Sequence, residues 1–150
     1  DFVFSCPPYH DLEVYTDDSR DLSNMDYDTF LVTYEHIIKE ATSMLKNNRF
    51  ACFVVGDVRD KKGFYKNFVS RTTDIFEKAG LRLYNEIILI TSLGTLPIVA
   101  AKTFNPGRKV CKAHQNVLVF YKGDIKQIKE TFREVCVLEM DEYNEPRPME

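Results

Sequence analysis

No stretch of this 150-residue sequence is apolar for long enough to cross a bilayer. The longest apolar runs, residues 87–90 and 117–121, are far shorter than the roughly 20 residues that a membrane-spanning helix needs. The start also lacks a basic segment followed by an apolar core, so it shows no secretory signal. These absences exclude a membrane-spanning chain, and the first residue, Asp1, predicts that the chain is cut from a longer protein.

Cysteine is scarce and scattered, since Cys6, Cys52, Cys111 and Cys136 lie far apart along the sequence. Cys52 lies inside an apolar run, where a reduced thiol packs as a small hydrophobic side chain. This usage fits a reducing, cytoplasmic compartment. The net charge of −3 excludes a protein that coats nucleic acid with its whole surface, although it averages over segments of opposite sign.

Closely spaced glycines are also absent: no two of the six glycines fall within two residues of each other. Phosphate and nucleoside cofactors of open α/β sheets are usually received by a glycine-rich turn after the first strand. The sequence therefore excludes a turn of that kind within these 150 residues.

What is present is the alternation of an α/β domain. The order strand, helix, strand, helix, strand, loop, strand predicts a partly parallel sheet with helices on both faces and an antiparallel final pair of strands. Strands are predicted at residues 2–5, 50–55, 81–91 and 115–121, helices at 30–45, 64–79 and 125–135, and loops at 11–28 and 92–113.

The chain divides into a folded part, residues 1–135, and an acidic tail, residues 136–150. The tail is rich in proline and glutamate, a composition that cannot bury a core. We expect one domain followed by an extended segment.

The first predicted strand ends in Ser5, Cys6, Pro7, Pro8 and Tyr9, at the position where open α/β sheets build their sites. Two consecutive prolines fix the backbone and remove competing N–H donors, which leaves a carbonyl to point outward. The neighbouring tyrosine offers an aromatic face to a planar ligand. Such a turn suits a nucleobase that has been rotated out of its stack.

In this place, the turn resembles the catalytic loop of the amino-group DNA methyltransferases, which reads Asp, Asn or Ser, then Pro-Pro, then Tyr, Phe or Trp. The resemblance continues through residues 50–60 and 112–124, and it is strongest to phage-type and ParB-associated DNA methylases. It implies the later half of a Rossmann-like S-adenosylmethionine-dependent methyltransferase sheet. It also implies methyl transfer to N6 of adenine or N4 of cytosine, in a bacterial or phage-encoded protein of the restriction-modification type.

By this resemblance, the Pro7 carbonyl accepts a hydrogen bond from the target amine and Tyr9 stacks on the base. The sequence departs from the family pattern at Cys6, which stands where a stronger acceptor side chain is expected. Because a thiol is a weak acceptor, either the carbonyl and Ser5 do most of the work or the target differs from the common ones. The candidate catalytic residues are Ser5, Cys6, Pro7, Pro8 and Tyr9.

The resemblance places the S-adenosylmethionine loop upstream of Asp1, so that this chain is the catalytic half and is inactive alone. Asp57, at the end of the second core strand, is a candidate for orienting the cofactor or DNA, and capping the following turn explains it equally well. A sheet without its first strands exposes an apolar edge. We therefore expect pairing with the upstream half or with a second copy of the chain.

Basic residues gather in two segments, one after the second strand and one in the long loop. An antiparallel final pair of strands brings both segments to the edge that carries the diproline turn, where DNA phosphates would lie. A merely solvated loop is the alternative. The candidate DNA-binding residues are Arg59, Lys61, Lys62, Lys102, Arg108, Lys109, Lys112 and His114.

Three other interpretations stay open. Cys6 and His10 could join Cys111 and His114 in a four-ligand zinc site, although the spacing is loose. The domain could instead be a non-catalytic nucleic-acid-binding or assembly module that keeps the fold. Finally, the same turn could serve an RNA or protein methyltransferase, because activation of an amine does not depend on the polymer.

Overall fold

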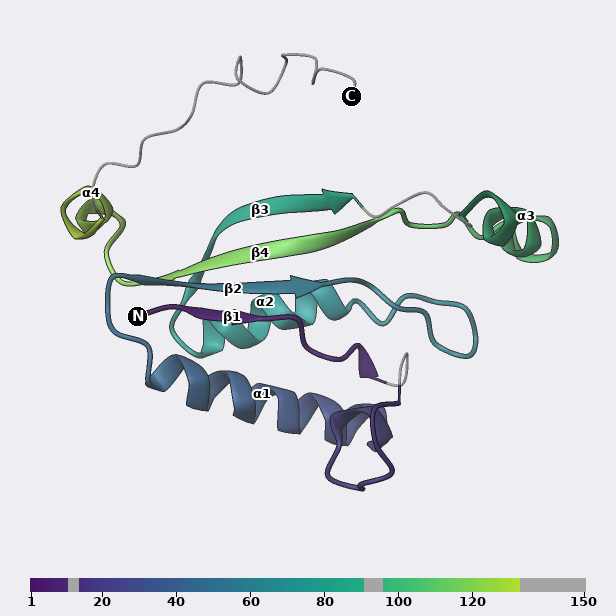
Figure 1. Ribbon diagram of the computed structural model, residues 1–150, viewed down its shortest axis with the longest axis horizontal. Coiled ribbons are helices and arrows are strands. Elements are labelled where there is room, and N and C mark those ends of the chain that lie inside the picture. Colours follow the sequence, from purple (N-terminus) through teal and green to yellow (C-terminus); the bar gives the residue numbers. More distant parts are fainter. Residues whose placement is uncertain (11–13, 91–95, 133–150) are drawn as a thin grey trace, which may run out of the picture.

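The computed structural model describes residues 1–10, 14–90 and 96–132, which form one mixed four-stranded sheet with helices against it (Figure 1). The strand order is β1-β2-β4-β3, with β1 (Val3–Ser5) parallel to β2 (Arg49–Val55). β4 (His114–Lys122) runs antiparallel to both β2 and β3 (Arg82–Ile90). The predicted α/β class and the antiparallel final pair are confirmed.

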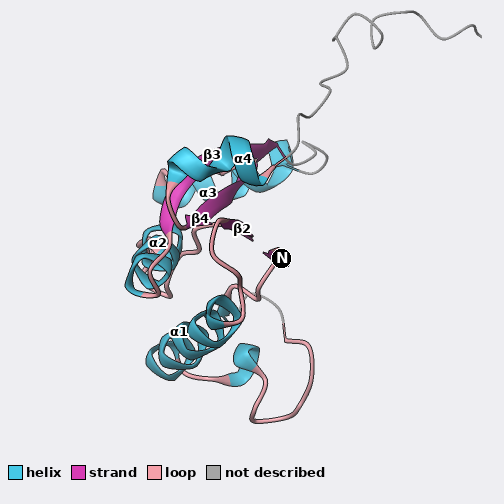
Figure 2. Cartoon of the chain, turned by 90° about the vertical axis from the view of Figure 1, so that its left-hand side faces the viewer, coloured by secondary structure: helices cyan, strands magenta, loops and turns pink. Residues whose placement is uncertain are grey.

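Two long helices, α1 (Tyr27–Ser43) and α2 (Phe68–Lys78), pack on the same face of this sheet (Figures 1 and 2). Alternate residues of β2 and β4 point to that face and join the helices in the buried core. Phe76 of α2 stacks on Phe120 of β4, with ring centroids 4.0 Å apart. The core thus lies between this pair of helices and the middle strands.

The opposite face is less covered among the described residues. Phe50 of β2 contacts Tyr121 and also Phe132, which follows the short helix α4 (Ile128–Thr131). Elsewhere on this face Phe4 is 60% exposed and Ile87 56% exposed. Helices therefore approach both faces, as predicted, but unequally, and β3 forms an exposed sheet edge in the described part of the chain.

The segment 92–113 was predicted as a loop, and this prediction is wrong for most of its length. It contains α3 (Leu96–Gly107), which extends away from the sheet (Figure 1). Pro97 lies in the first turn of α3, where a backbone N–H has no helical acceptor to lose. Pro106 lies in the last turn, where it removes one helical hydrogen bond, and α3 ends at the next residue, Gly107. These prolines mark the ends of a helix rather than an irregular segment.

The helix predicted over residues 64–79 begins later, at Phe68. The residues before it form a hairpin in which Arg59 pairs with Tyr65 and the Asp60 N–H donates to the Phe64 carbonyl at 2.8 Å. Gly63 supplies the turn with a φ of 93°, a conformation that favours glycine. We call residues 59–65 the basic hairpin.

The remaining boundaries follow the sequence prediction more closely. The acidic segment 11–28 includes a 3-10 turn (Leu22–Asn24) and the start of α1, and residues 11–13 lie outside the described part. The helix predicted at 125–135 consists of a 3-10 turn (Ile125–Gln127) and α4, while residues 133–150, including the predicted tail, also lie outside it. Within the described ranges, no helix is long and apolar enough to cross a bilayer.

Candidate active site and nucleic-acid interface

The diproline turn, residues 5–9, follows β1 and lies at the carboxyl end of the two parallel strands. Cys6 is exposed, while Ser5, Pro7, Pro8 and Tyr9 are partly buried. The turn is therefore accessible and is not sealed inside the core. The turn lies at the end of the first strand, where the sequence predicts it.

Tyr9 is anchored to two other strands. Its hydroxyl donates to the Val54 carbonyl at 3.4 Å and accepts from Gln115 Nε2 at 2.9 Å. One part of its ring lies over Gly56, where an added Cβ would be 3.5 Å from Tyr9 Cε2, and its centroid is 6.0 Å from that of Phe68. The ring is thus held in one orientation between the end of β2 and the start of β4.

Burial raises the pKa of Tyr9 to about 12, with smaller contributions from Cys6 and Tyr15. The phenol is therefore protonated near neutral pH, so it can donate one hydrogen bond while accepting another. A neutral ring in this place can stack on a base without adding a charge to the site.

His10 follows Tyr9 directly. It is buried, and its backbone adopts a left-handed conformation with a φ of 62°. Its Nδ1 lies 2.9 Å from Lys66 Nζ, and its Nε2 lies 2.9 Å from the Met25 carbonyl. An ammonium group only donates hydrogen bonds, so Nδ1 accepts from Lys66 and Nε2 carries the hydrogen that is donated to Met25. Lys66 also lies over the ring of Tyr27, 4.5 Å from its centroid.

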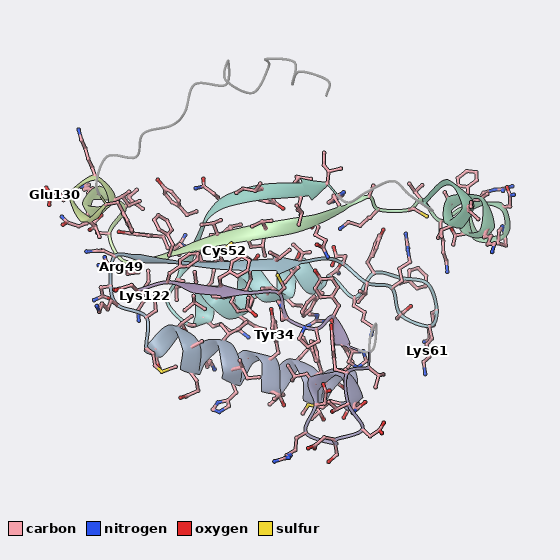
Figure 3. The ribbon with its side chains drawn as sticks, in the orientation of Figure 1. Tyr34, Arg49, Cys52, Lys61, Lys122 and Glu130 are labelled. Carbon is pink, nitrogen blue, oxygen red and sulfur yellow. The ribbon has the colours of Figure 1, made fainter. Side chains whose placement is uncertain are left out.

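A cavity of about 470 Å³ lies between His10 and the basic hairpin, and we call it the hairpin cavity. Figure 3 shows Lys61 at the outer end of this hairpin, beyond the carboxyl end of β2. Three of the predicted DNA-binding residues thus come together here. The cavity is lined by His10, Arg59, Asp60, Lys61, Lys62 and Lys66.

A second cavity, of about 280 Å³, separates the basic hairpin from α3, and we call it the α3 cavity. Arg59 also lines this cavity, with its guanidinium 3.9 Å from the Tyr65 ring centroid and its Nη1 donating to the Gly63 carbonyl at 2.8 Å. The other lining residues are Asp57, Tyr65, Val99, Thr103, Lys109, Val110, Cys111 and Lys112.

The remaining predicted DNA-binding residues line neither cavity. Lys102 is exposed on α3, and His114 pairs with Ile90 in the β3–β4 ladder. Arg108 donates to the carbonyls of Phe104 and Asn105, which closes the end of α3.

Two further hypotheses from the sequence concern Asp57 and a zinc site. Asp57 lines the α3 cavity, and its Oδ1 also accepts the N–H of Val69 at 3.2 Å, at the start of α2. No group of three or more His, Cys, Asp or Glu side chains that could hold a metal ion occurs among the described residues. The zinc alternative therefore lacks support in this part of the chain.

Three residues of this site were not predicted from the sequence in the roles they take. Gln115 was read only as the start of a strand, Lys66 as part of a helix, and His10 only as a zinc ligand. Of these, His10 carried a usable signal, because it directly follows the diproline turn. Lys66 and Gln115 reach the site only through the tertiary fold. Lys66 is 56 positions from its partner His10 in the sequence, and Gln115 is 106 positions from its partner Tyr9.

A family model described as DNA methylase matches residues 1–147. The chain belongs to this family of DNA methylases. The match covers nearly the whole sequence and includes the diproline turn, so the resemblance drawn from that turn is confirmed. No curated protein sequence matches the chain.

Solved structures agree with the methylase fold. A Thermus thermophilus protein with a provisional assignment as a DNA modification methylase superposes with a TM-score of 0.58 at 18% identity, over 89% of this chain and 51% of its own. The same protein complexed with S-adenosyl-L-methionine gives 0.56 at 17% identity, over 97% and 51%. The present chain thus spans about half the length of these structures.

Proposed function

We propose that the polypeptide carrying this chain transfers a methyl group from S-adenosylmethionine to an exocyclic amine of a DNA base, N6 of adenine or N4 of cytosine. The observation that carries this proposal is the accessible diproline turn, with Tyr9 fixed by β2 and β4 and two cation-lined cavities beside it. The family match supports the reaction class.

The turn offers what this reaction needs. The lone pair of an aromatic amine is delocalised into its ring, so acceptors that bind the amine hydrogens shift electron density toward the nitrogen. We assign this role to the Pro7 carbonyl, with Ser5 and Cys6 nearby in sequence, and we assign the stacking surface to Tyr9. Because Tyr9 is held by the two hydrogen bonds of its hydroxyl, its ring is already oriented before the base arrives.

S-adenosylmethionine is the second substrate of the proposed reaction, and the described residues supply little of a site for it. Asp57 is the candidate contact within this chain, with one carboxylate oxygen already bonded to Val69. The sequence has no closely spaced glycines, and the chain spans half of the related structures. We therefore propose that the main S-adenosylmethionine site is formed by other residues of the same polypeptide.

The domain bounds, the pairing of the sheet edges and the biological setting are parts of the same proposal. We assign residues 1–135 to the catalytic domain and 136–150 to a tail. The two edge strands of the described sheet, β1 and β3, leave edges that the rest of the polypeptide or a second copy would pair with. A place in a phage or bacterial restriction-modification system, and among the phage-type and ParB-associated methylases, belongs to this proposal as well.

The test is methyl transfer by the natural polypeptide that carries these 150 residues. Incubation with radiolabelled S-adenosylmethionine and unmethylated duplex DNA should label the DNA, and nucleoside mass spectrometry should identify either N6-methyladenine or N4-methylcytosine. Labelling of RNA but not DNA would contradict the DNA assignment. Tight DNA binding without any methyl transfer would favour the non-catalytic module.

Tyr9→Ala tests the assigned stacking role. Loss of one stacking surface is worth about 1–3 kcal/mol, so kcat/KM should fall by about 10- to 100-fold. Tyr9→Phe keeps the ring and loses only the bonds to Val54 and Gln115, so its loss should be smaller. Full activity of Tyr9→Ala would show that the base is held elsewhere.

A further inference from the structure

We propose that the hairpin cavity is a binding pocket for a DNA phosphodiester, and that His10 positions Lys66 within it. The proposal rests on the proposed function and adds to it the place at which the DNA strand beside the target base is held. Since His10 follows Tyr9 directly, a phosphate in this cavity would lie next to the nucleotide on the diproline turn.

The charge of the lining favours an anion. Arg59, Lys61, Lys62 and Lys66 contribute four positive charges to the described lining, against the single carboxylate of Asp60. That carboxylate accepts the N–H of Phe64 at 2.9 Å, so one of its oxygens serves the hairpin's own turn. A cluster of cations around a concave surface raises the local concentration of an anionic polymer.

The backbone of the basic hairpin is held in a defined arrangement. Its two sides are tied by the Asp60–Phe64 backbone bond and by the bond from Lys66 N–H to the Val58 carbonyl at 2.9 Å. Arg59 is further held by Gly63 and by the Tyr65 ring. Less conformational freedom is then lost when a phosphate binds.

His10 connects this pocket to the catalytic turn. Its Nδ1 accepts a hydrogen bond from Lys66, and its Nε2–H bond to Met25 fixes the ring in the tautomer that allows this. Tyr27 and Phe30 contact the ring edge-on, with centroids 5.2 and 5.4 Å away. His10 therefore acts as a positioning residue, and Lys66 as the group that contacts the phosphate.

The size of the cavity fits a segment of backbone. About 470 Å³ is more than a single phosphate needs and lies within the range of about 300–1,000 Å³ seen for small-molecule sites. The cavity therefore has room for a phosphodiester with its flanking sugars. A flat cluster of exposed lysines would not restrict the strand in this way.

The experiment measures binding of a short mixed-sequence DNA duplex to the natural polypeptide as a function of salt concentration. Lys66→Gln should weaken binding by about tenfold and reduce the slope of log affinity against log salt by about one, the amount expected for one lost phosphate contact. Lys66→Arg, which keeps the charge, should stay close to wild type. Thermal melting of each variant shows that it is folded.

Lys126→Gln is the matched control, because Lys126 is exposed beyond the opposite end of β4. It should leave both affinity and slope unchanged. A duplex with uncharged methylphosphonate linkages should bind wild type and Lys66→Gln equally, which separates a phosphodiester contact from a contact with the bases. An unchanged slope in Lys66→Gln, or an equal change in Lys126→Gln, would overturn the pocket.

His10 is tested by two substitutions. His10→Ala removes the acceptor for Lys66 and should reproduce most of the loss seen in Lys66→Gln. His10→Asn retains an acceptor close to the Nδ1 position and tolerates the left-handed backbone, so it should recover part of the affinity. Wild-type binding by both variants would contradict the positioning role.

These outcomes separate this inference from the function it rests on. DNA methylation by the wild type, together with an unchanged salt slope in Lys66→Gln, would overturn the pocket and leave the proposed function standing. A reduced slope without any methyl transfer would support the pocket and count against the proposed reaction.

Discussion

The two ends of the sheet use positive charge in different ways. At the end where β2 begins, Lys122 donates to the carbonyls of Thr42 and Leu45, both at 2.7 Å, and closes the last turn of α1. Arg49 donates to the Asn48 carbonyl at 2.9 Å (Figure 3 labels both cations). At the end where β2 finishes, the cations of the basic hairpin line two cavities.

This difference separates cations that stabilise the fold from cations that can bind a ligand. Lys122 replaces the missing hydrogen-bond donors at a helix end and complements its dipole. The lysines around the hairpin and α3 cavities gather instead around open space beside the diproline turn. Composition alone cannot make this distinction, because both groups count equally toward the net charge of −3.

We call the end of the sheet where β2 begins the structural end, and the end where β2 finishes the ligand-binding end. The sharpest test of the structural end is Lys122→Met, which keeps the apolar part of the side chain and removes the ammonium group. Two partly buried carbonyls lose a charged donor, so we expect the free energy of unfolding to fall by about 2–3 kcal/mol. Urea denaturation measures this loss, and DNA affinity should not change while the protein is folded.

Lys126→Met is the control for this prediction, since Lys126 is exposed and close to Lys122 in sequence. Its effect on unfolding should be within about 0.5 kcal/mol. An equally small effect of Lys122→Met would remove the distinction between the two ends.

The second prediction concerns the α3 cavity. Lys109→Gln combined with Lys112→Gln should lower DNA affinity by about tenfold, equivalent to about 1.4 kcal/mol, because both line this cavity beside Arg59. Stability should change little. Fluorescence anisotropy with labelled duplex measures the affinity.

The double variant Lys46→Gln and Lys126→Gln carries the same charge change at the structural end, where Lys46 pairs with Asp1 on the surface. It should bind DNA like the wild type. Equal losses in the two double variants would show that only net charge matters, and the proposed difference between the ends would fail.

Much of the fold could be predicted from the sequence because its signals are local. The apolar stripe of α1 and its capping residue Asp26 are visible as spacing, and the unbroken apolar run of β2 indicates a buried strand. The sequence does not predict α3 because its glycines and prolines are typical of a loop, although both prolines stand in the end turns of the helix. The start of α2 was misplaced because the apolar Phe64 fits the helical stripe while belonging to the hairpin.

In the site, too, features with a local sequence signal could be predicted and those that depend on the tertiary fold could not. The diproline turn could be found from adjacent residues and their place after a strand. The partners that hold it could not, because Gln115 meets Tyr9, and Lys66 meets His10, only when strands distant in sequence are paired. The sequence also gives every basic residue of the two segments the same DNA-binding role, whereas the structure distinguishes those that line a cavity from Arg108, which closes a helix.

The third prediction asks which role Asp57 plays at the ligand-binding end. If it only caps α2, Asp57→Ala should lower the free energy of unfolding by about 1 kcal/mol, and Asp57→Asn, which keeps an acceptor, by less. Urea denaturation gives both values. Isothermal titration with S-adenosylmethionine then tests the other role, because weaker binding by a stable Asp57→Asn would show that the carboxylate contacts that substrate.

The smallest expected effect lies at the start of α1, where the side chain of Asp26 accepts the backbone N–H groups of Asp28 and Thr29. The Thr29 hydroxyl is the main cause of a pKa of Asp26 below the ordinary value of 3.8. A carboxyl with a lowered pKa in the folded state stabilises the protein fully above its unfolded pKa, and this contribution is lost as the pH falls through the lowered value. Asp26→Ser keeps a cap that does not titrate, so its stability should decline less than that of wild type when urea midpoints are compared between pH 7 and acidic pH. Parallel curves for the two proteins would show that the charge of Asp26 contributes nothing to α1, and that its hydrogen bonds to the backbone alone stabilise this helix end.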